Sequence, residues 1–246
     1  PIVMARFTQK EIDAIKKNEN VAAVEEDGRC WALGVEQMPQ TLAVEGQPSV
    51  MAETIPAGVA QIKAPAAWDC TRGKGIKVAV LDTGIDYNHP DLKANYKFGI
   101  SFVSGESSVM DYHGHGTHCS GTIAAAINGI GVVGVAPATY LYAVKVLSRY
   151  GSGAWSNLIA GIDWCVNKQD LDILSMSLGA DSAPTALGTM CQLAWAKGAL
   201  LVAAAGNNGG AVGYPAKYPS VIAVSAIDSA NNLAPFSSRG PEVELC

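Results

Sequence analysis

"IKVAVLDTG", residues 76 to 84, is a continuous apolar run that ends at Asp82 and passes into a turn. Because polar residues do not alternate with apolar ones, both faces of a strand formed here should be covered, as in a parallel sheet between helical layers. Similar runs occur at 141–147, 171–178, 199–206 and 221–227. Segments of helical length separate them, namely the small-residue stretch after His115, 154–168 and 185–198. The sequence therefore predicts an α/β fold, with a parallel central sheet and helices on both faces.

The chain has 246 residues, of which 49% are hydrophobic and 16% charged, so it can bury one large core and carry a small appendage. Its formal net charge of −5 comes without a cluster of Lys and Arg, which argues against nucleic acid or an anionic membrane as a partner. The apolar stretch at 198–206 is too short to cross a bilayer. We expect a monomer with no nucleic-acid and no membrane partner.

Six cysteines are scattered without CxxC or Cys/His spacing, which argues against a zinc site. Disulfide pairing stays open at this point. Cys119 lies within the small-residue stretch and is expected to be a buried free thiol.

The first 51 residues differ in character from the rest. Residues 7–28 predict an amphipathic helix with a Lys-rich end, followed by a short strand that ends in acidic residues. Residues 28–51 contain glycines and prolines without a sustained period and predict a linker. The predicted organisation is a small α+β segment at 1–27, a linker at 28–51 and the main domain at 52–246.

Asp82, His115 and Asn207 all fall at the ends of predicted strands or in the loops that follow them. The carboxyl ends of parallel strands share one edge, so we expect the three side chains to converge there. Taken singly, each has a structural interpretation: an Asx turn, a scaffold histidine and a turn-forming asparagine. At a helix start between Gly114 and Gly116, His115 is expected to stay neutral, as a general base requires. The amide of Asn207 is a candidate donor to an oxyanion.

Seven blocks in order carry a resemblance to a known family over roughly residues 52–241: "VAVLDTGIDYNHPDL", "HGHGTHCSGTIAA", "GVVGVAPATYLYAVKVL", "YGSGAW", "SMSLGA", "VAAAGNNG" and "FSSRGP". The sequence resembles the subtilisin-type serine proteases of the subtilase family. The resemblance implies an endopeptidase that acts on polypeptides through an Asp/His/Ser triad. Asp82 would orient His115, His115 would move the proton, and Asn207 would donate to the oxyanion.

By the same resemblance, two extended edges would hold a substrate peptide by strand addition. The matching residues are Gly151, Ser152, Gly153 and Ala154 on one edge and Ser177, Leu178 and Gly179 on the other. An open pocket would be lined by Ala203, Ala204, Gly206 and Gly213. This predicts a preference for large apolar side chains before the cut, with broad tolerance. The glycines could also be ordinary loop glycines.

The stretch "AAAINGIGVVG" resembles the family's structural calcium loop, whose oxygen ligands suit a hard cation. The matching ligands are Glu53, Asp91 and Asn128, with the backbone carbonyls of Ala126, Ile130 and Val132. Asp91 could instead be a helix or turn cap after Pro90.

The opening segment, above all "VAAVEED" at 21–27, resembles the second half of the family's inhibitory propeptide. This implies a secreted zymogen whose own propeptide is an intramolecular inhibitor, with the processing site expected between Val50 and Ala52.

The family's serine lies in a GTSMA-like block, and residues 1–246 contain none. Ser237 and Ser238 match a structural loop upstream of that block. We therefore expect a main domain incomplete at its carboxyl end, and a chain that is inactive and uncut by itself although its gene encodes an endopeptidase.

Three rival interpretations remain. A non-catalytic peptide-binding protein is favoured by the missing serine, but it would not require Asp82, His115 and Asn207 together. An α/β-hydrolase is disfavoured because no G-x-S-x-G elbow is present. An aspartic protease would need a second DTG loop on a β-rich scaffold.

Overall fold

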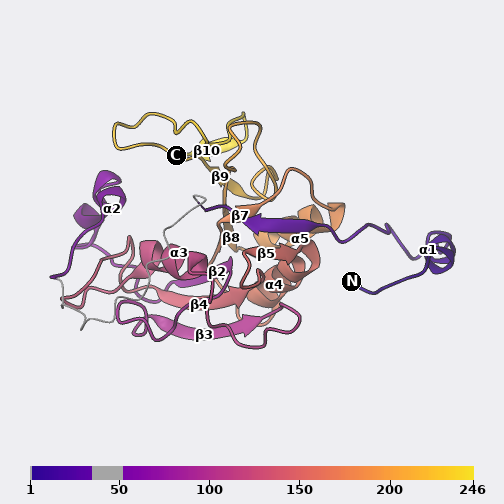
Figure 1. Ribbon diagram of the computed structural model, residues 1–246, viewed down its shortest axis with the longest axis horizontal. Helices are drawn as coiled ribbons and strands as arrows, with labels where there is room; N and C mark the ends of the chain where they lie inside the picture. Colours follow the sequence, from indigo (N-terminus) through magenta and orange to yellow (C-terminus); the bar gives the residue numbers. More distant parts are fainter. Residues whose placement is uncertain (1, 35–51) are drawn as a thin grey trace.

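A computed structural model describes residues 2–34 and 52–246 of the protein. The strands of this part form one seven-stranded and one three-stranded sheet, with helices packed around the larger sheet (Figure 1). A short arm that carries α1 (Gln9–Ile15) extends away from the main body, at the right of the view.

The larger sheet is parallel throughout and has the order β10-β9-β8-β6-β2-β4-β3. Its strands are β2 (Lys77–Asp82), β3 (Tyr96–Ser101), β4 (Tyr140–Lys145), β6 (Ile173–Met176), β8 (Leu200–Ala204), β9 (Ile222–Val224) and β10 (Val243–Leu245). The predicted α/β fold is confirmed, and each predicted apolar run contains a strand. The edge strands β3 and β10 were not predicted, because their partly exposed residues form no continuous apolar run.

The chain winds outward from β2 in both directions, since β4 pairs with one side of β2 and β6 with the other. Such a switch point opens a crevice at the carboxyl ends of the neighbouring strands. Asp82 is the last residue of β2 and therefore lies at this crevice.

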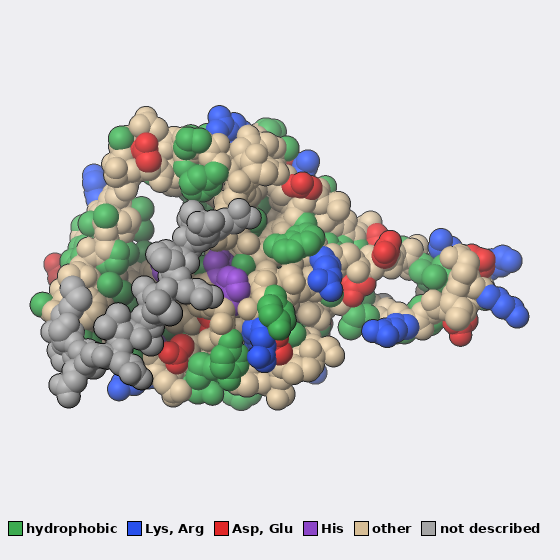
Figure 2. Space-filling model, in the orientation of Figure 1, with side chains coloured by type: hydrophobic (Ala, Val, Ile, Leu, Met, Phe, Trp, Pro, Cys, Tyr) green, Lys and Arg blue, Asp and Glu red, His purple; other side chains and the backbone are tan. Residues whose placement is uncertain are grey.

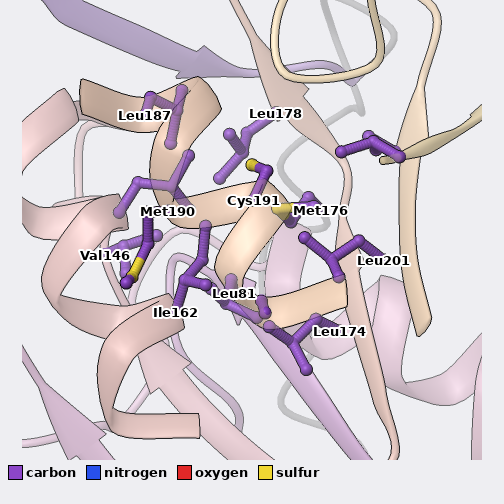
Figure 3. Packing of buried hydrophobic residues seen from close by; sticks show 14 of the residues in the cluster. Leu81, Val146, Ile162, Leu174, Met176, Leu178, Leu187, Met190, Cys191 and Leu201 are labelled. Carbon is purple, nitrogen blue, oxygen red and sulfur yellow. The ribbon is translucent and has the colours of Figure 1, made fainter. Parts of the chain in front are cut away.

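Helices cover both faces of the sheet, as predicted. Two of them, α4 (Trp155–Asn167) and α5 (Thr185–Ala196), pack on the face where Leu81 of β2 points, and Figure 3 shows Leu81 together with Ile162 and Met190 of these helices. The preceding residue of β2, Val80, belongs to the second apolar cluster on the opposite face, where α3 (His115–Ala124) packs. Each fully buried Leu or Ile contributes roughly 1.5–3 kcal/mol by leaving water.

The smaller sheet is antiparallel, with β1 (Arg29–Ala32) lying between β5 (Ser152–Ala154) and β7 (Leu178–Gly179). The expectation of a linker without regular structure is wrong for residues 29–32. The hydrogen-bond partners of these residues are more than a hundred positions away along the chain. The strand therefore depends on this distant pairing, and its own four residues are too few to show a hydrophobic period. The rest of the predicted linker, residues 35–51, including the expected processing site at Val50–Ala52, lies largely outside the described residues.

The predicted helix of the first segment is present as α1, which has a capping box between Thr8 and Glu11 and buries no residue. The strand predicted for residues 21–27 is wrong, because that stretch forms no regular element. It runs toward the main body and is held there by side-chain contacts of Glu25 and Asp27.

The main domain opens with two short elements that were not predicted, α2 (Ala57–Gln61) and the 3-10 helix η1 (Ala64–Ala67). Within the described ranges, none of the helices is both long and apolar enough to span a membrane.

Candidate active site

Asp82 and His115 meet at the carboxyl edge of the parallel sheet. Nδ1 of His115, at the first residue of α3, lies 2.8 Å from Oδ1 and 2.9 Å from Oδ2 of Asp82. The Asp82 side chain is 1% exposed and that of His115 is 11% exposed. Asp82 also accepts the backbone N–H of Thr83 at 2.6 Å, so its Asx-type contact and its contact to the imidazole coexist.

Two features of the sequence allow α3 to approach β2 this closely. Gly116 is buried, and a Cβ there would collide with the carbonyl oxygen of Gly84, so the helix start needs a residue without a side chain. Asp111 accepts hydrogen bonds from Thr83 Oγ1 at 2.9 Å and from the backbone N–H of Thr117 at 2.9 Å. It therefore ties the end of β2 to the first turn of α3.

Asp111 was not predictable from the sequence, because a single acidic residue before a histidine forms no pattern. Burial raises the pKa of Asp111, but hydrogen bonds from the amides of Gly114, Thr117 and His113 outweigh burial and hold the pKa below its ordinary value. Asp111 therefore stays ionised as a structural anchor for the loop before His115.

The contact with Asp82 opposes the effect of the helix start, from which a neutral His115 was expected. Burial lowers the pKa of His115, but the hydrogen bond and negative charge of Asp82, with a contribution from Cys119, raise it well above its ordinary value. A carboxylate in direct contact acts more strongly than the partial charge of a helix start. The Asp82 carboxylate therefore stabilises the imidazolium form of His115 relative to an isolated imidazole.

Cys119 lies one turn after His115 on α3, with Sγ 3.9 Å from Nδ1 and 4.0 Å from Nε2 of the imidazole. It is a free thiol, as expected, but half-buried and not buried. The thiol, the imidazole and the Asp82 carboxylate offer three potential metal-ligand atoms within 4.8 Å of one another. The 2.8 Å contact between Asp82 and His115 has the length of a charge-assisted hydrogen bond, so we describe this group as a hydrogen-bonded pair with a neighbouring thiol.

A buried ion pair supports the loop that carries Asp82. The Lys145 side chain is fully buried at the end of β4, where Nζ donates to the carbonyl oxygen of Thr83 and lies 3.2 Å from Oε2 of Glu106. The other carboxylate oxygen of Glu106 accepts the backbone N–H of Arg149 at 3.1 Å. The pair thus joins three loops at the carboxyl edge. The sequence analysis missed it because Lys145 lies within an apparently apolar strand.

Asn207 follows β8 on the same edge. Its Nδ2 donates to the carbonyl oxygen of Gly34 at 3.3 Å, so the amide faces the chain that leaves β1. Asp82 and His115 therefore meet as expected. Asn207 lies on the other side of the chain at Gly34, which passes between Asn207 and His115.

The two predicted substrate edges are β5 and β7, and β1 fills the space between them. Cys30 pairs with Gly153, and Trp31 pairs with both Ser152 and Gly179. The backbone N–H of Ala32 donates to Gly151 at 2.8 Å, and that of Leu33 donates to Ser177 at 2.8 Å. The remaining predicted edge residues, Ala154 and Leu178, pair with Arg29 and Ala32. Every predicted edge residue therefore lies against this strand.

Two carboxylates before β1 cap helices of the main domain. Glu25 accepts the backbone N–H groups of Thr185 and Ala186, the first two residues of α5, at 2.8 and 3.0 Å. Asp27 accepts the backbone N–H of Ser156, near the start of α4, at 3.0 Å. Neither helix has a capping side chain of its own at the preceding residue. The segment before β1 therefore supplies both caps.

Two cavities adjoin the end of β1. One of about 280 Å³ is lined by Trp31, Leu33, Gly179, Tyr214 and others, including the predicted pocket residues Ala204, Gly206 and Gly213. The second, about 370 Å³, is also lined by Leu33 and contains the fourth predicted pocket residue, Ala203, which is 2% exposed. Ala204 and Gly206 line both cavities, as does Leu33, whereas Ala203 lines only the one of about 370 Å³ and Gly213 only the one of about 280 Å³.

The predicted calcium residues gather around the loop after α3. The carboxylate of Asp91, which is 3% exposed, accepts Nδ2 of Asn128 at 3.2 Å and the backbone N–H of Val132 at 3.1 Å. Glu53 Oε1 accepts the backbone N–H of Asn128 at 2.6 Å. Gly131 has φ of 61°, and a Cβ there would collide with the Asp91 carboxylate.

The main chain of the same loop completes the group. Ala126 donates its backbone N–H to the carbonyl oxygen of Asp91 at 2.8 Å. Ile130 pairs with Ala52, and its own backbone N–H reaches Oδ1 of Asn128 at 3.0 Å. Two carboxylates and the amide of Asn128 therefore gather at this loop, and oxygen ligands of this kind suit a hard cation. Coordination would require Asn128 to turn its amide oxygen toward the ion.

Ser237 and Ser238 lie away from the imidazole. Both are buried, with Ser237 Oγ accepting the backbone N–H of Ala226 at 2.9 Å and Ser238 Oγ donating to Oδ1 of Asn208 at 2.9 Å. Within residues 2–34 and 52–246, no serine hydroxyl hydrogen-bonds His115.

The fold is a parallel α/β sheet with a buried Asp–His pair at its carboxyl edge. A model of the subtilase family, peptidase S8, matches residues 73–245. The chain therefore belongs to the subtilase family.

Individual relatives agree with this assignment. Subtilisin E of Bacillus subtilis (strain 168) is 45% identical over 98% of this chain and 60% of its own length. The subtilisin of Bacillus pumilus is 50% identical over 79% of this chain and 72% of its own length. M-protease of Shouchella clausii (strain KSM-K16) is 40% identical over 100% of this chain and 59% of its own length. The chain thus spans about 60% of the length of most of these relatives.

Proposed function

We propose that the protein is a serine endopeptidase that hydrolyses polypeptides, with Asp82 and His115 as two members of its triad. The observation that carries this proposal is the buried 2.8 Å contact between Asp82 and Nδ1 of His115 at the switch point of the sheet. That contact fixes the tautomer and leaves Nε2 of His115 to face a reacting hydroxyl.

In the proposed reaction, Nε2 of His115 accepts the proton of a serine hydroxyl while the hydroxyl oxygen bonds to the substrate carbonyl carbon. His115 then gives this proton to the leaving amine as the C–N bond breaks, and water repeats the sequence to release the acid. Asp82 stabilises the intermediate imidazolium, and its effect on the pKa of His115 supports this role. Asn207 Nδ2 donates to the oxyanion.

No GTSMA-like block occurs in residues 1–246, and no serine hydroxyl of the described residues hydrogen-bonds His115. We therefore propose that the 246 residues alone are inactive and that the complete gene product is the enzyme. A non-catalytic peptide-binding protein is the alternative, and the test below separates the two.

The segment 25–34 would act as an intramolecular inhibitor, the terminal part of a propeptide. Its support is that β1 pairs with both predicted substrate edges, while Glu25 and Asp27 cap two helices of the main domain. A polypeptide substrate would use the same edges once the segment has left. Export as a zymogen fits these features and is part of the proposal.

The protein would also bind one structural calcium ion. Asp91, Glu53 and Asn128 would supply side-chain oxygens, with the carbonyls of Ala126, Ile130 and Val132. When bound, the ion would stabilise the loop after α3 and the start of the main domain, which are already joined by pairing between Ala52 and Ile130. It takes no part in the peptide-bond chemistry proposed here.

The apolar walls of the cavity beside Gly179 support a preference for large apolar side chains before the cut. We expect a panel of peptides to be cleaved best after Leu, Phe, Tyr or Met. Cleavage only after Arg or Asp would overturn this specificity.

The experiment compares the complete gene product with the 246-residue chain, using a fluorophosphonate probe and a peptide substrate with an apolar residue before the cut. The complete protein, freed of its first segment, should be labelled once and hydrolyse the peptide, and His115→Ala should abolish both. His118→Ala, an exposed histidine on the same helix, is the matched control and should retain activity. An unlabelled, inactive complete protein would overturn the proposal. Labelling of the 246-residue chain at a single site would overturn the expectation that it is inactive.

A further inference from the structure

We propose that Asp181 allows the cavity beside Gly179 to accept a second class of side chain, so that the protein cleaves after Lys and Arg as well as after large apolar residues. This inference rests on the proposed endopeptidase function and extends its substrates to cationic side chains. The chemistry of the cut is unchanged, and only the residue before it differs.

The cavity of about 280 Å³ combines apolar walls with one charge. Leu33, Trp31 and Tyr214 contribute apolar surface, and Asp181 is the only charged residue among the described residues that line it. Asp181 is exposed, so its carboxylate lies at the rim, where the cavity meets water. A side chain in this cavity therefore meets both apolar surface and a single negative charge.

Backbone pairing fixes the position of Asp181. The residue before it, Ala180, donates its N–H to the carbonyl oxygen of Tyr214 at 3.2 Å and accepts the N–H of Tyr214 at 2.9 Å. Gly179 permits this approach, because a Cβ there would collide with the carbonyl oxygen of Tyr214. Asp181 follows directly after this pair, so its backbone is held where the wall of the cavity ends.

A chain of hydrogen bonds orients the carboxylate. Oδ1 of Asn208 accepts the hydroxyl of the buried Ser238 at 2.9 Å and the backbone N–H of Gly210 at 2.9 Å. Because the amide oxygen faces these two donors, Nδ2 points the other way and donates to Oδ1 of Asp181 at 3.0 Å. Within the described part of the chain, Oδ2 of Asp181 has no hydrogen-bond or ion-pair partner. One oxygen is therefore anchored, and the other remains available to a ligand.

Leu33 shows how a side chain enters this cavity. Its Cδ1 lies 3.4 Å from the point where a Cβ on Gly179 would be. Lys and Arg have longer, unbranched stems than Leu, and such side chains lay their methylene groups on apolar surface while the charge stays in water. A Lys at the place of Leu33 would cover the apolar walls with its stem and bring its ammonium to the exposed Asp181. Arg would do the same with a planar guanidinium.

Lys217 is a cation beside the same cavity and sets a limit on this effect. Its Nζ lies 5.8 Å from the ring centroid of Tyr214, which lines the cavity. Among the described residues, no ion pair joins Lys217 to Asp181, so the carboxylate is not neutralised. Lys217 nevertheless opposes a second positive charge nearby. Since exposed ion pairs contribute little, we expect Asp181 to favour a cationic side chain by about fivefold or less.

A double-mutant cycle tests the contact in the 246-residue chain without any need for catalysis. Leu33→Lys places an ammonium in the cavity, and the protection factor of the Ala32 amide, which donates to Gly151, reports how firmly β1 is held. Asp181→Asn removes the charge but keeps an oxygen that can accept the amide of Asn208. It should lower the protection factor about two- to fivefold in the Leu33→Lys chain and leave it unchanged beside Leu33. Equal effects in both chains would overturn the inference.

A second measurement uses the complete gene product, freed of its first segment, and two peptides that differ only in having Leu or Lys before the cut. Both should be hydrolysed. Asp181→Asn should lower kcat/KM for the Lys peptide about two- to fivefold and leave the Leu peptide unchanged, and salt should weaken the effect of Asp181. Lys217→Gln should raise kcat/KM for the Lys peptide. Asp69→Asn, at an exposed carboxylate that lines neither cavity, is the matched control and should alter neither peptide.

The two peptides also separate this inference from the proposed function. If the Leu peptide is hydrolysed and the Lys peptide is not, only the inference fails. It fails equally if Asp181→Asn changes both peptides by the same factor, which would indicate a structural role, or changes neither. If neither peptide is hydrolysed by the parent enzyme, the endopeptidase proposal itself fails.

Discussion

The two sheets of this protein are held together in different ways. In the parallel sheet, β2 has buried residues over almost its whole length. All seven strands of this sheet come from the main domain. In the antiparallel sheet, β1 alternates exposed and buried residues, and it pairs with short strands far away along the chain. The parallel sheet is the core of the main domain, whereas β1 is attached to β5 and β7 by backbone pairing at the surface of that domain. Changes in the first should therefore alter global unfolding, and changes in the second should alter local opening.

The largest effect is expected at the buried ion pair beneath the parallel sheet's carboxyl edge. Lys145→Met leaves Glu106 without its buried partner and removes the bond to the Thr83 carbonyl, so the free energy of unfolding should fall by about 3–5 kcal/mol. Denaturant unfolding of the 246-residue chain measures this. Lys97→Met, at an exposed position, should change stability by less than about 0.5 kcal/mol. Equal effects of the two variants would show that the buried pair is not a structural anchor.

The next effect concerns the pKa of His115. Asp82 raises it above its ordinary value of 6.5, so the stabilisation from the protonated pair is fully present below pH 6.5 and is lost as pH rises through the raised pKa of the folded state. Asp82→Asn should lower the pKa of His115 by about 1–3. The decrease should be larger if burial of the imidazole is then the strongest remaining influence on its pKa. NMR titration of the imidazole in the 246-residue chain measures this without any need for catalysis.

Asp86→Asn is the matched control for that titration, because Asp86 accepts the N–H of Asn88 and does not contact His115. It should leave the pKa of His115 nearly unchanged. An unchanged pKa in Asp82→Asn would mean that the contact at the switch point does not form in solution.

Residues with local patterns were predictable. The strand ending at Asp82, the helix starting at His115 and their meeting at one edge follow from buried runs and from the geometry of parallel strands. Lys145 was not recognised, because a buried lysine is stabilised only by Glu106 and Thr83, which come from other loops. β1 was not recognised for the same reason, since its pairing depends on β5 and β7 and not on its own period. Sequence patterns thus report local burial but not partners that are distant along the chain.

The loop after α3, which carries the proposed calcium site, pairs with the start of the main domain and offers a third measurement. With calcium at about 100 times its dissociation constant, the proposed site should add about 2.7 kcal/mol to the free energy of unfolding. Asp91→Asn should remove most of this gain, and Glu53→Gln should reduce it, because each removes negative charge from the oxygen ligands. Glu19→Gln, an exposed residue of the first segment, is the control. Melting curves that do not respond to calcium or to a chelator would contradict the proposed site.

The smallest effect is expected where the antiparallel sheet is anchored. Glu25→Gln and Asp27→Asn weaken the caps of α5 and α4, and each should cost about 1 kcal/mol, seen as faster hydrogen exchange at the amides of Ala32 and Leu33. The neighbouring Glu26→Gln should have no effect, since Glu26 makes neither contact. Global unfolding should stay the same, which would separate the attachment from the core.

Acid should act on the same anchor. Burial raises the pKa of Glu25, but the hydrogen bonds from Thr185 and Ala186 outweigh this and hold it below its ordinary value of 4.5. The contribution of this cap is therefore complete above pH 4.5 and is lost as pH falls through the lowered pKa. The protection factor of the Leu33 amide, which is corrected for the intrinsic pH dependence of exchange, should fall on acidification in the parent chain and change less in Glu25→Gln, which has no carboxylate to protonate. If both chains respond equally, the cap does not hold β1 in place, and the antiparallel sheet depends on its backbone ladder alone.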